Sequence, residues 1–235
     1  MFSNAFLSTM TAVLACSSFA AAAPQSRSTN STPEVSLTTK LRQADTSIDR
    51  YKLLPDDKDF VYNLKNSQTG FADAQSFPAL TGTGTSLAVA EIPGCSMVMV
   101  HLHPRASEVF ALLSGKVYTE AIPEAGVLTR DGKPRVIRNE LSPGDVTVFY
   151  QGAYHTQVNP DCEPASAVAA FASEDVGTTI IAPALFSLSD EVITRTFGQS
   201  IAGEDIDKVR HALPQGIAIK VDECLAKCGK QKRQA

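Results

Sequence analysis

Two stretches decide the fold of this chain: residues 94–115, GCSMVMVHLHPRASEVFALLSG, and residues 144–159, GDVTVFYQGAYHTQVN. Both contain short runs of β-branched, aromatic and other apolar residues, interrupted by Gly, Pro, Asp and Ser, a pattern typical of strands joined by turns. The chain of 235 residues has four histidines, and three of them lie in these two stretches. The stretches therefore predict strands that also carry the polar chemistry of the protein.

The same pattern extends on both sides, and no long helical periodicity interrupts it. Many short strands at this spacing predict a mainly β fold, either a sandwich or a barrel. We expect strands at residues 86–92, 96–103, 108–113, 116–120, 135–140, 145–150, 155–158 and 165–173. After Ser187 the pattern changes, and short helices are expected at Asp190–Phe197, Glu204–Leu213 and Asp222–Lys227.

Alternation along the predicted strand 96–103 places His101 and His103 on one face, together with Met97 and Met99. Pro104 favours a turn after this strand. Glu108 then begins the next strand, and a hairpin would bring its carboxylate back over the two imidazoles. These residues can therefore supply three ligands to a single ion.

A fourth ligand candidate is His155, which begins a later strand, with Gln157 and Asn159 following on the same face. Three neutral imidazoles and one carboxylate suit a divalent transition metal and leave positions for water or substrate. Ligand type alone leaves manganese, iron, zinc, nickel and copper open. The remaining histidine, His211, falls in a polar run on an expected helix, where a solvent-exposed position is expected.

The N-terminal region predicts export. Residues 1–22 are apolar and small, with several small-residue cleavage sites among Ala20–Ala23, and are expected to be a signal peptide rather than a buried helix. Residues 23–45 are rich in Ser, Thr and Gln and predict a flexible lead-in. It contains a glycosylation sequon at Asn30, which Pro33 could leave unoccupied. Residues 46–188 are expected to form the β core, and residues 189–235 a helical extension and tail.

Four cysteines remain after the signal peptide, an even number that suits an oxidising compartment. They are Cys95, Cys162, Cys224 and Cys228. Of the three possible pairings we favour Cys95–Cys162 with Cys224–Cys228. The alternative is that the four cysteines form no disulfide and are free, buried thiols. The first bridge would connect the two strands of the metal site, and the second would hold a local turn.

Composition limits the partners. The formal net charge is −4, which argues against a nucleic-acid-binding protein, because such proteins usually carry a basic face. No apolar stretch reaches the roughly 18–20 residues of a membrane-spanning helix.

The two stretches resemble the two motifs of the cupin family. Gly94, His101-Leu102-His103, Glu108 and Gly115 match the first motif, and Gly144, Gly152, His155 and Asn159 match the second. The His-Pro-Arg-Ala and His-x-Gln-x-Asn segments resemble the germin-like branch. The secreted form, the Asn-Pro-Asp-Cys-Glu segment at 159–163 and the cysteine-bearing tail are most similar to spherulin-like germins of fungi and slime moulds.

This resemblance implies a double-sheet jelly-roll β-barrel with short C-terminal helices. It also implies manganese on His101, His103, Glu108 and His155, and assembly into trimers or hexamers. Activities in the family include oxalate oxidase and superoxide dismutase, and other members have wall or storage roles. The implied location is secreted, either extracellular or in the cell wall.

Two departures from the germin pattern bear on the substrate. The first motif has one residue more than usual before its first histidine, and Val98-Met99-Val100 stands where oxalate-oxidising germins have Asn-Pro-Pro. Tyr150 replaces the proline of the second motif. We therefore expect weak or absent oxalate oxidation. Gln157 and Asn159 remain the nearest polar side chains to the metal ligands, either to contact a substrate or to form structural hydrogen bonds inside the barrel.

Three functions remain open. The first is a manganese enzyme acting on superoxide, a small anion or another small oxygenated substrate. The second is a metal-binding wall, spore or storage protein without turnover. The third, a cupin that binds a small ligand without metal, is disfavoured because all four ligands are present.

Overall fold

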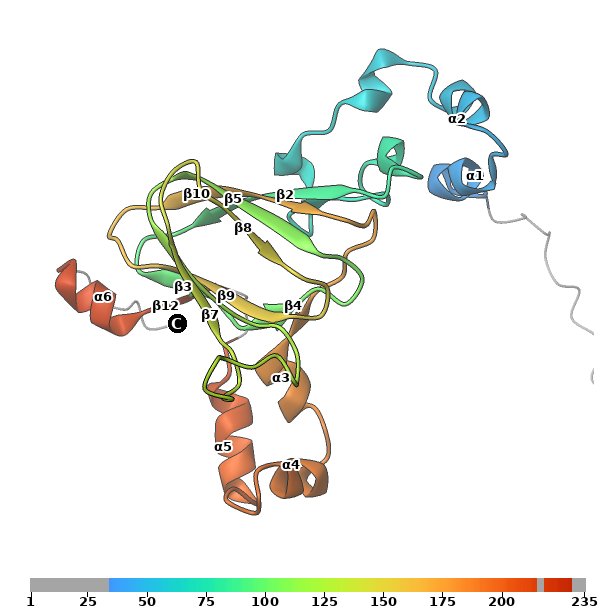
Figure 1. Ribbon diagram of the computed structural model, residues 1–235. Coiled ribbons are helices and arrows are strands. Elements are labelled where there is room, and N and C mark those ends of the chain that lie inside the picture. Colours follow the sequence, from blue (N-terminus) through green and yellow to red (C-terminus); the bar gives the residue numbers. More distant parts are fainter. Residues whose placement is uncertain (1–33, 215–217, 230–235) are drawn as a thin grey trace, which may run out of the picture. The chain divides into compact units, whose positions relative to one another are not determined.

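The structure is a computed structural model that describes residues 34–214 and 218–229 (Figure 1). The described chain from Val35 onward forms one compact unit. The expected signal peptide at 1–22 and the sequon at Asn30 lie outside the described residues. No helix within the described ranges is both long and apolar enough to cross a bilayer.

The first of two antiparallel sheets has the strand order β1-β2-β10-β5-β8. Every strand of it except the short β1 was expected from the short apolar runs between turn residues. The strands are β1 (Phe71–Ala72), β2 (Ser86–Ile92), β10 (Ala165–Phe171), β5 (Glu108–Ser114) and β8 (Val146–Phe149).

The second sheet has the order β11-β4-β9-β3-β12, and β6 pairs with both β9 and β7. Its strands are β11 (Thr179–Ile180), β4 (His101–Leu102), β9 (Tyr154–Asn159), β3 (Ser96–Val98), β12 (Ala218–Lys220), β6 (Val117–Ile122) and β7 (Ile137–Leu141). Figure 1 shows the two sheets facing each other, which confirms the expected mainly β, double-sheet jelly roll.

The core lies between the sheets and takes one face of each strand. Burial along β6 alternates strictly, so that Val117, Thr119 and Ala121 point inward while the residues between them are exposed. The buried apolar cluster consists of Ile92, Ala106, Phe110, Leu112, Val117, Ala121, Leu141, Phe149, Ala165, Ala167, Ala169, Phe171 and Val176. The inward face is therefore apolar over most of its area, and the polar residues on it require an explanation.

The expected strand 96–103 is divided into β3 and β4 by a β-bulge. Met97 lies opposite Val158 and His101 opposite His155, so the chain advances four residues on one strand and three on the other. A bulge of this kind shifts the phase of the side chains.

The bulge changes which residues accompany the histidines. Val98 packs against the core between the sheets, and Val100 is exposed. Met97 lies opposite Val158, which alternates with the buried His155, Gln157 and Asn159, so the expectation that Met97 shares the face of the histidines is wrong. Met99 is buried. The additional residue noted in the sequence is the residue that the bulge absorbs.

The helices surround the strands. They are α1 (Leu37–Gln43), α2 (Ser47–Leu53), α3 (Ile181–Phe186), α4 (Asp190–Thr196), α5 (Glu204–Ala212) and α6 (Asp222–Lys227), with short 3-10 turns at Asp57–Phe60, Leu64–Asn66 and Pro78–Leu80. The three expected C-terminal helices correspond to α4, α5 and α6. His211 is exposed on α5, as expected.

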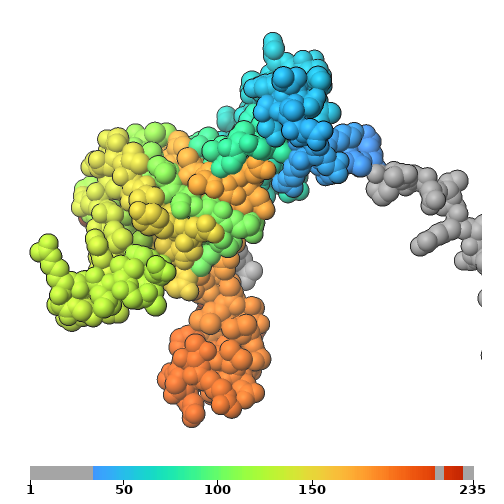
Figure 2. All heavy atoms as spheres, turned by 45° about the vertical axis from the view of Figure 1, so that its right-hand side comes forward, coloured from blue at the N-terminus to red at the C-terminus, as the bar shows by residue number. Residues whose placement is uncertain are grey.

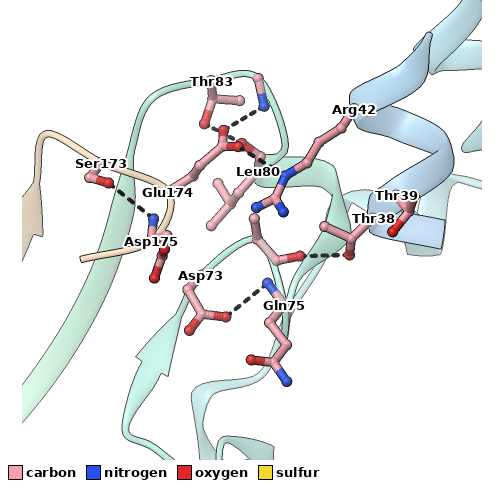
Figure 3. A network of polar contacts seen from close by, with 12 residues as sticks. Thr38, Thr39, Arg42, Asp73, Gln75, Leu80, Thr83, Ser173, Glu174 and Asp175 are labelled. Atoms are coloured by element: carbon pink, nitrogen blue, oxygen red, sulfur yellow. Dashed lines mark hydrogen bonds and ion pairs between the residues drawn. The ribbon is translucent and has the colours of Figure 1, made fainter. Parts of the chain in front are cut away.

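Helix α1 lies within the segment 23–45, for which we expected a flexible lead-in, and that expectation is wrong at residues 37–43. Ser36 caps the helix by accepting the N–H of Thr39, and Leu41 is almost fully buried. Figure 3 shows how α1 is attached to the loop that follows β10: Arg42 faces Glu174, with 3.9 Å between Nε and the carboxylate. The buried leucine, the Ser36 cap and the Arg42–Glu174 contact therefore stabilise a helix that the local sequence does not predict.

The two disulfides join Cys95 to Cys224 and Cys162 to Cys228, with Cα–Cα distances of 5.2 and 5.7 Å. The favoured pairing, Cys95–Cys162 with Cys224–Cys228, is therefore wrong. Strand β12 pairs with β3 and delivers α6 to the end of the sheet. Cys224 in α6 and Cys228, which caps its C-terminus, lie one turn apart, so each faces a different cysteine of the barrel. Both bridges thus attach the C-terminal helix to the sheet that carries the histidines.

Candidate metal centre

Four residues from three places in the barrel converge on one point. His101 comes from β4, His103 directly follows it, Glu108 begins β5 and His155 lies on β9. All four are at most 4% exposed, and one ligand atom from each lies within 4.8 Å of the others. The structure therefore brings together the complete set of ligands that the sequence predicted.

The hydrogen bonds of the imidazoles define their orientation. Nδ1 of His101, His103 and His155 lies 2.9, 2.7 and 2.8 Å from the carbonyl oxygens of Met99, Gly177 and Ala153, respectively. A carbonyl oxygen only accepts, so each Nδ1 carries the proton and donates it. In a neutral imidazole, Nε2 is then an unprotonated acceptor.

These acceptors meet the carboxylate without a donor between them. Nε2 of His103 lies 3.0 Å from Oε2 of Glu108, and Nε2 of His155 lies 3.1 Å from the same oxygen. Acceptor atoms this close repel one another unless a proton or a cation lies among them. The donor set of three imidazole nitrogens and one carboxylate therefore fits a divalent transition metal.

Burial and neighbouring groups alter the titration of this group. The pKa of His101 is lowered to about 4, first because burial disfavours the charged imidazolium and second because His155 adds repulsion. Burial alone would raise the pKa of Glu108, but the contacts of its carboxylate with the His103 and His155 rings, which favour the charged carboxylate whenever a ring takes up a second proton at Nε2, outweigh it and lower that pKa to about 2. At neutral pH the group therefore holds an ionised carboxylate and an uncharged His101, the forms that bind a metal.

Aromatic rings hold the imidazoles in place. Phe149 stacks on His155 with ring centroids 4.2 Å apart, and Phe171 meets His103 edge-on at 4.8 Å. Both phenylalanines belong to the apolar core. Sequence reasoning did not identify them, or the Gly177 carbonyl, because nothing in the local pattern places residues 149, 171 and 177 beside the histidines.

The two expected polar neighbours have different positions. Gln157 is buried beside the histidines, and its Oε1 has no hydrogen-bond partner among the described residues. The side chain of Asn159 is fully buried: its Nδ2 donates to the carbonyls of Ile92 and Glu163, and its Oδ1 accepts from the N–H of Asp161. Gln157 is thus available to a ligand, whereas Asn159 holds the turn that carries Cys162.

This turn also explains the glycine of the first motif. A Cβ on Gly94 would overlap the backbone carbonyl of Cys162, so the two segments can approach only at a glycine. Cys95 next to it adopts a positive φ of 52° and donates its N–H to the Asp161 carbonyl. Gly94 therefore serves the packing beneath the site and does not bind a ligand.

Comparison with known proteins gives consistent results. The sequence profile described as Cupin matches residues 52–205. Spherulin-1A of Physarum polycephalum is 34% identical over 82% of this chain and 79% of its own length. Germin-like protein subfamily 2 member 3 of Arabidopsis thaliana is 33% identical over 65% of this chain and 66% of its own length.

Among solved structures, a recombinant oxalate oxidase in complex with glycolate is similar in fold. It aligns with a TM-score of 0.56 over 66% of this chain and 81% of that chain, at 18% identity. An identity this low supports the fold alone. The profile match, the relatives and the buried three-histidine, one-glutamate group agree, and this chain belongs to the cupin family, as a germin-like cupin close to the spherulins.

Proposed function

We propose that this protein is a secreted manganese-binding cupin that performs redox chemistry on superoxide or another small oxygenated substrate. The observation that carries the proposal is the convergence of three imidazole Nε2 atoms and one carboxylate with no hydrogen-bond donor among them. A bound manganese ion would supply a change of valence and an open coordination position.

The chain contributes the environment of that ion. His101, His103, Glu108 and His155 would hold it, and the three backbone carbonyls fix the tautomer and direction of each ring. Phe149 and Phe171 exclude water from two of the rings. Gln157 offers an amide to a group bound beside the metal ligands.

The second candidate function is that of a non-catalytic, metal-binding wall, spore or storage protein. Both disulfides attach the C-terminal helix to the ligand-bearing sheet, as suits a protein built for durability. Oxalate oxidation is the third candidate, suggested by the fold likeness to the oxalate oxidase. It is weakened because Val98 faces the site where an amide was expected.

Secretion and assembly are part of the proposal. Two disulfides favour an oxidising compartment. Exposed apolar side chains on the helical segment after β11, shown in orange in Figure 2, favour contact with further copies of the chain, as a trimer or hexamer; they are Leu188, Val192 and Phe197.

The test is metal analysis combined with two assays on purified protein. We expect about one manganese per chain, inhibition of superoxide-driven dye reduction, and little peroxide from oxalate. Glu108→Gln should lose metal and activity together, whereas Glu120→Gln, at an exposed position on β6, should retain both.

The possible results separate the candidates. Metal without turnover of superoxide would favour the non-catalytic role. Strong peroxide production from oxalate would favour the oxidase. A protein that takes up no transition metal would refute the proposal.

A further inference from the structure

A cavity of about 440 Å³ opens beside the metal ligands. His101, His103 and Glu108 line it, together with Gln157. The remaining wall is formed largely by apolar side chains from the two sheets. This volume is about three times the ~150 Å³ of a cavity that accepts benzene, and oxalate is about the size of benzene. A small oxygenated anion would therefore fill only a minor part of the space.

The space arises from small side chains at inward positions. Ala88 and Ala90 of β2 and Ala169 of β10 line the cavity where larger residues would fill it. Phe71, Phe110, Phe171, Ile92, Val98 and Ile180 supply the larger apolar surfaces.

Part of the cavity lining lies along strand β2, beside β1 at the edge of the first sheet. Strand β1 covers β2 only at Leu87 and Ala88, so within the described chain the edge of β2 beyond Ala88 is unpaired. Thr69, Gly70 and Glu91 line the cavity at exposed positions. A ligand larger than oxalate therefore has a route to the metal ligands.

Charge selects the chemistry of that ligand. The charged residues lining the cavity are Glu91 and Glu108, and no Lys or Arg is among the described lining residues. A divalent ion held by Glu108 leaves one positive charge, which one carboxylate neutralises. A second carboxylate on the ligand would add a negative charge that no Lys or Arg among the described lining residues offsets, and any carboxylate beyond the reach of the metal would face apolar walls, which is costly.

Resting on the proposed function, we propose that this site takes a monocarboxylate with an aromatic or branched aliphatic body. The carboxylate lies at the metal end, and the body packs among the phenylalanines and alanines of β2, β5 and β10. Gln157 Oε1, buried and without a partner among the described residues, accepts a hydrogen bond from a hydroxyl or N–H of the ligand.

Titration calorimetry on the manganese-loaded full-length protein tests this with three probes: 3-phenylpropionate, acetate and oxalate. Burying a phenyl group should make 3-phenylpropionate bind about 10–100-fold more tightly than acetate. Oxalate should bind more weakly than 3-phenylpropionate. Equal binding of the two monocarboxylates, or tightest binding of oxalate, would overturn the inference.

Two variants locate the binding site. Ala90→Leu fills the cavity and should weaken the binding of 3-phenylpropionate at least tenfold while leaving the binding of acetate unchanged. Ala88→Val tests the same point with a smaller increase in side-chain volume. Ala170→Leu, on the exposed face of β10, is the control and should bind like the wild type. If filling the cavity leaves 3-phenylpropionate binding intact, the ligand lies elsewhere and the inference fails.

Metal analysis of the same samples distinguishes a failure of the proposed function from a failure of the proposed ligand class. A protein without metal refutes the proposed function and this inference together. A protein that holds metal but does not distinguish the three acids refutes this inference alone.

Discussion

The metal-free protein should lose stability in mild acid because of His101. The pKa of this imidazole is lowered from 6.5 to about 4 in the folded chain, mainly by burial. Between these two values the unfolded chain binds more protons than the folded chain, so protonation favours unfolding. Stability therefore falls as pH drops through about 6.5 and levels off below about 4.

The size of the effect follows from the two pKa values. One pKa unit corresponds to about 1.4 kcal/mol, so between pH 7 and pH 4.5 the contribution of His101 is a loss of about 2 kcal/mol. Glu108 adds little in this range. Its folded pKa is lowered from 4.5 to about 2, so the stability that it contributes is present above pH 4.5 and is lost as pH falls toward 2.

Urea unfolding of chelator-stripped protein at pH 7 and pH 4.5 measures this loss. His101→Gln removes the titrating group and should reduce the pH-dependent loss by about 2 kcal/mol. His211→Gln, at an exposed position on α5, is the matched control and should behave like the wild type. If wild type and His101→Gln lose the same free energy of unfolding, another group is responsible and the reasoning about His101 is refuted.

Three further changes test the ligand set, the packing around it and the covalent links. Glu108→Gln should weaken manganese binding at least about 100-fold in a chelator competition, since losing an outer supporting residue alone costs about 10–100-fold; unchanged affinity would exclude Glu108 as a ligand. Phe149→Ala removes the ring stacked on His155 and should cost about 3–5 kcal/mol in urea unfolding, whereas Val148→Ala at the neighbouring exposed position should stay within about 0.5 kcal/mol. Similar costs for the two would contradict the packing. Replacing both Cys95 and Cys224 by Ser removes a bridge between residues 129 apart and should lower the free energy of unfolding by up to about 5 kcal/mol. Peptide mapping of the wild-type protein without reduction should recover Cys95 linked to Cys224. A Cys95–Cys162 peptide would contradict the structure.

Much of the fold was predictable because strand signals are local. Short β-branched or aromatic runs between turn residues located β2, β5, β6, β8, β9 and β10 to within a few residues, and the change of pattern after Ser187 located the C-terminal helices. The ligand residues were predictable for a related reason. A period of two puts His101 and His103 on one face, and a hairpin returns Glu108 to them.

The bulge and the disulfides were not predictable in this way. The sequence does not show where along a strand a bulge interrupts the alternation of faces. Met97 was therefore assigned to the face that Val98 occupies. Cysteine pairing depends on which segment packs against the end of β3. That segment is α6, more than a hundred residues later in the chain.

The sequence by itself thus determined the mainly β class and the grouping of His101, His103 and Glu108, because both follow from short-range periodicity and spacing, while the jelly roll followed from the resemblance to the cupin motifs. The tertiary structure alone decided the proton positions on the imidazoles, the separate roles of Gln157 and Asn159, and the cavity beside the site. Each of these depends on atoms contributed by segments distant in the chain. Gly177 lies 74 residues from His103, and the alanines that leave the cavity open belong to β2 and β10, which meet only when the sheet forms.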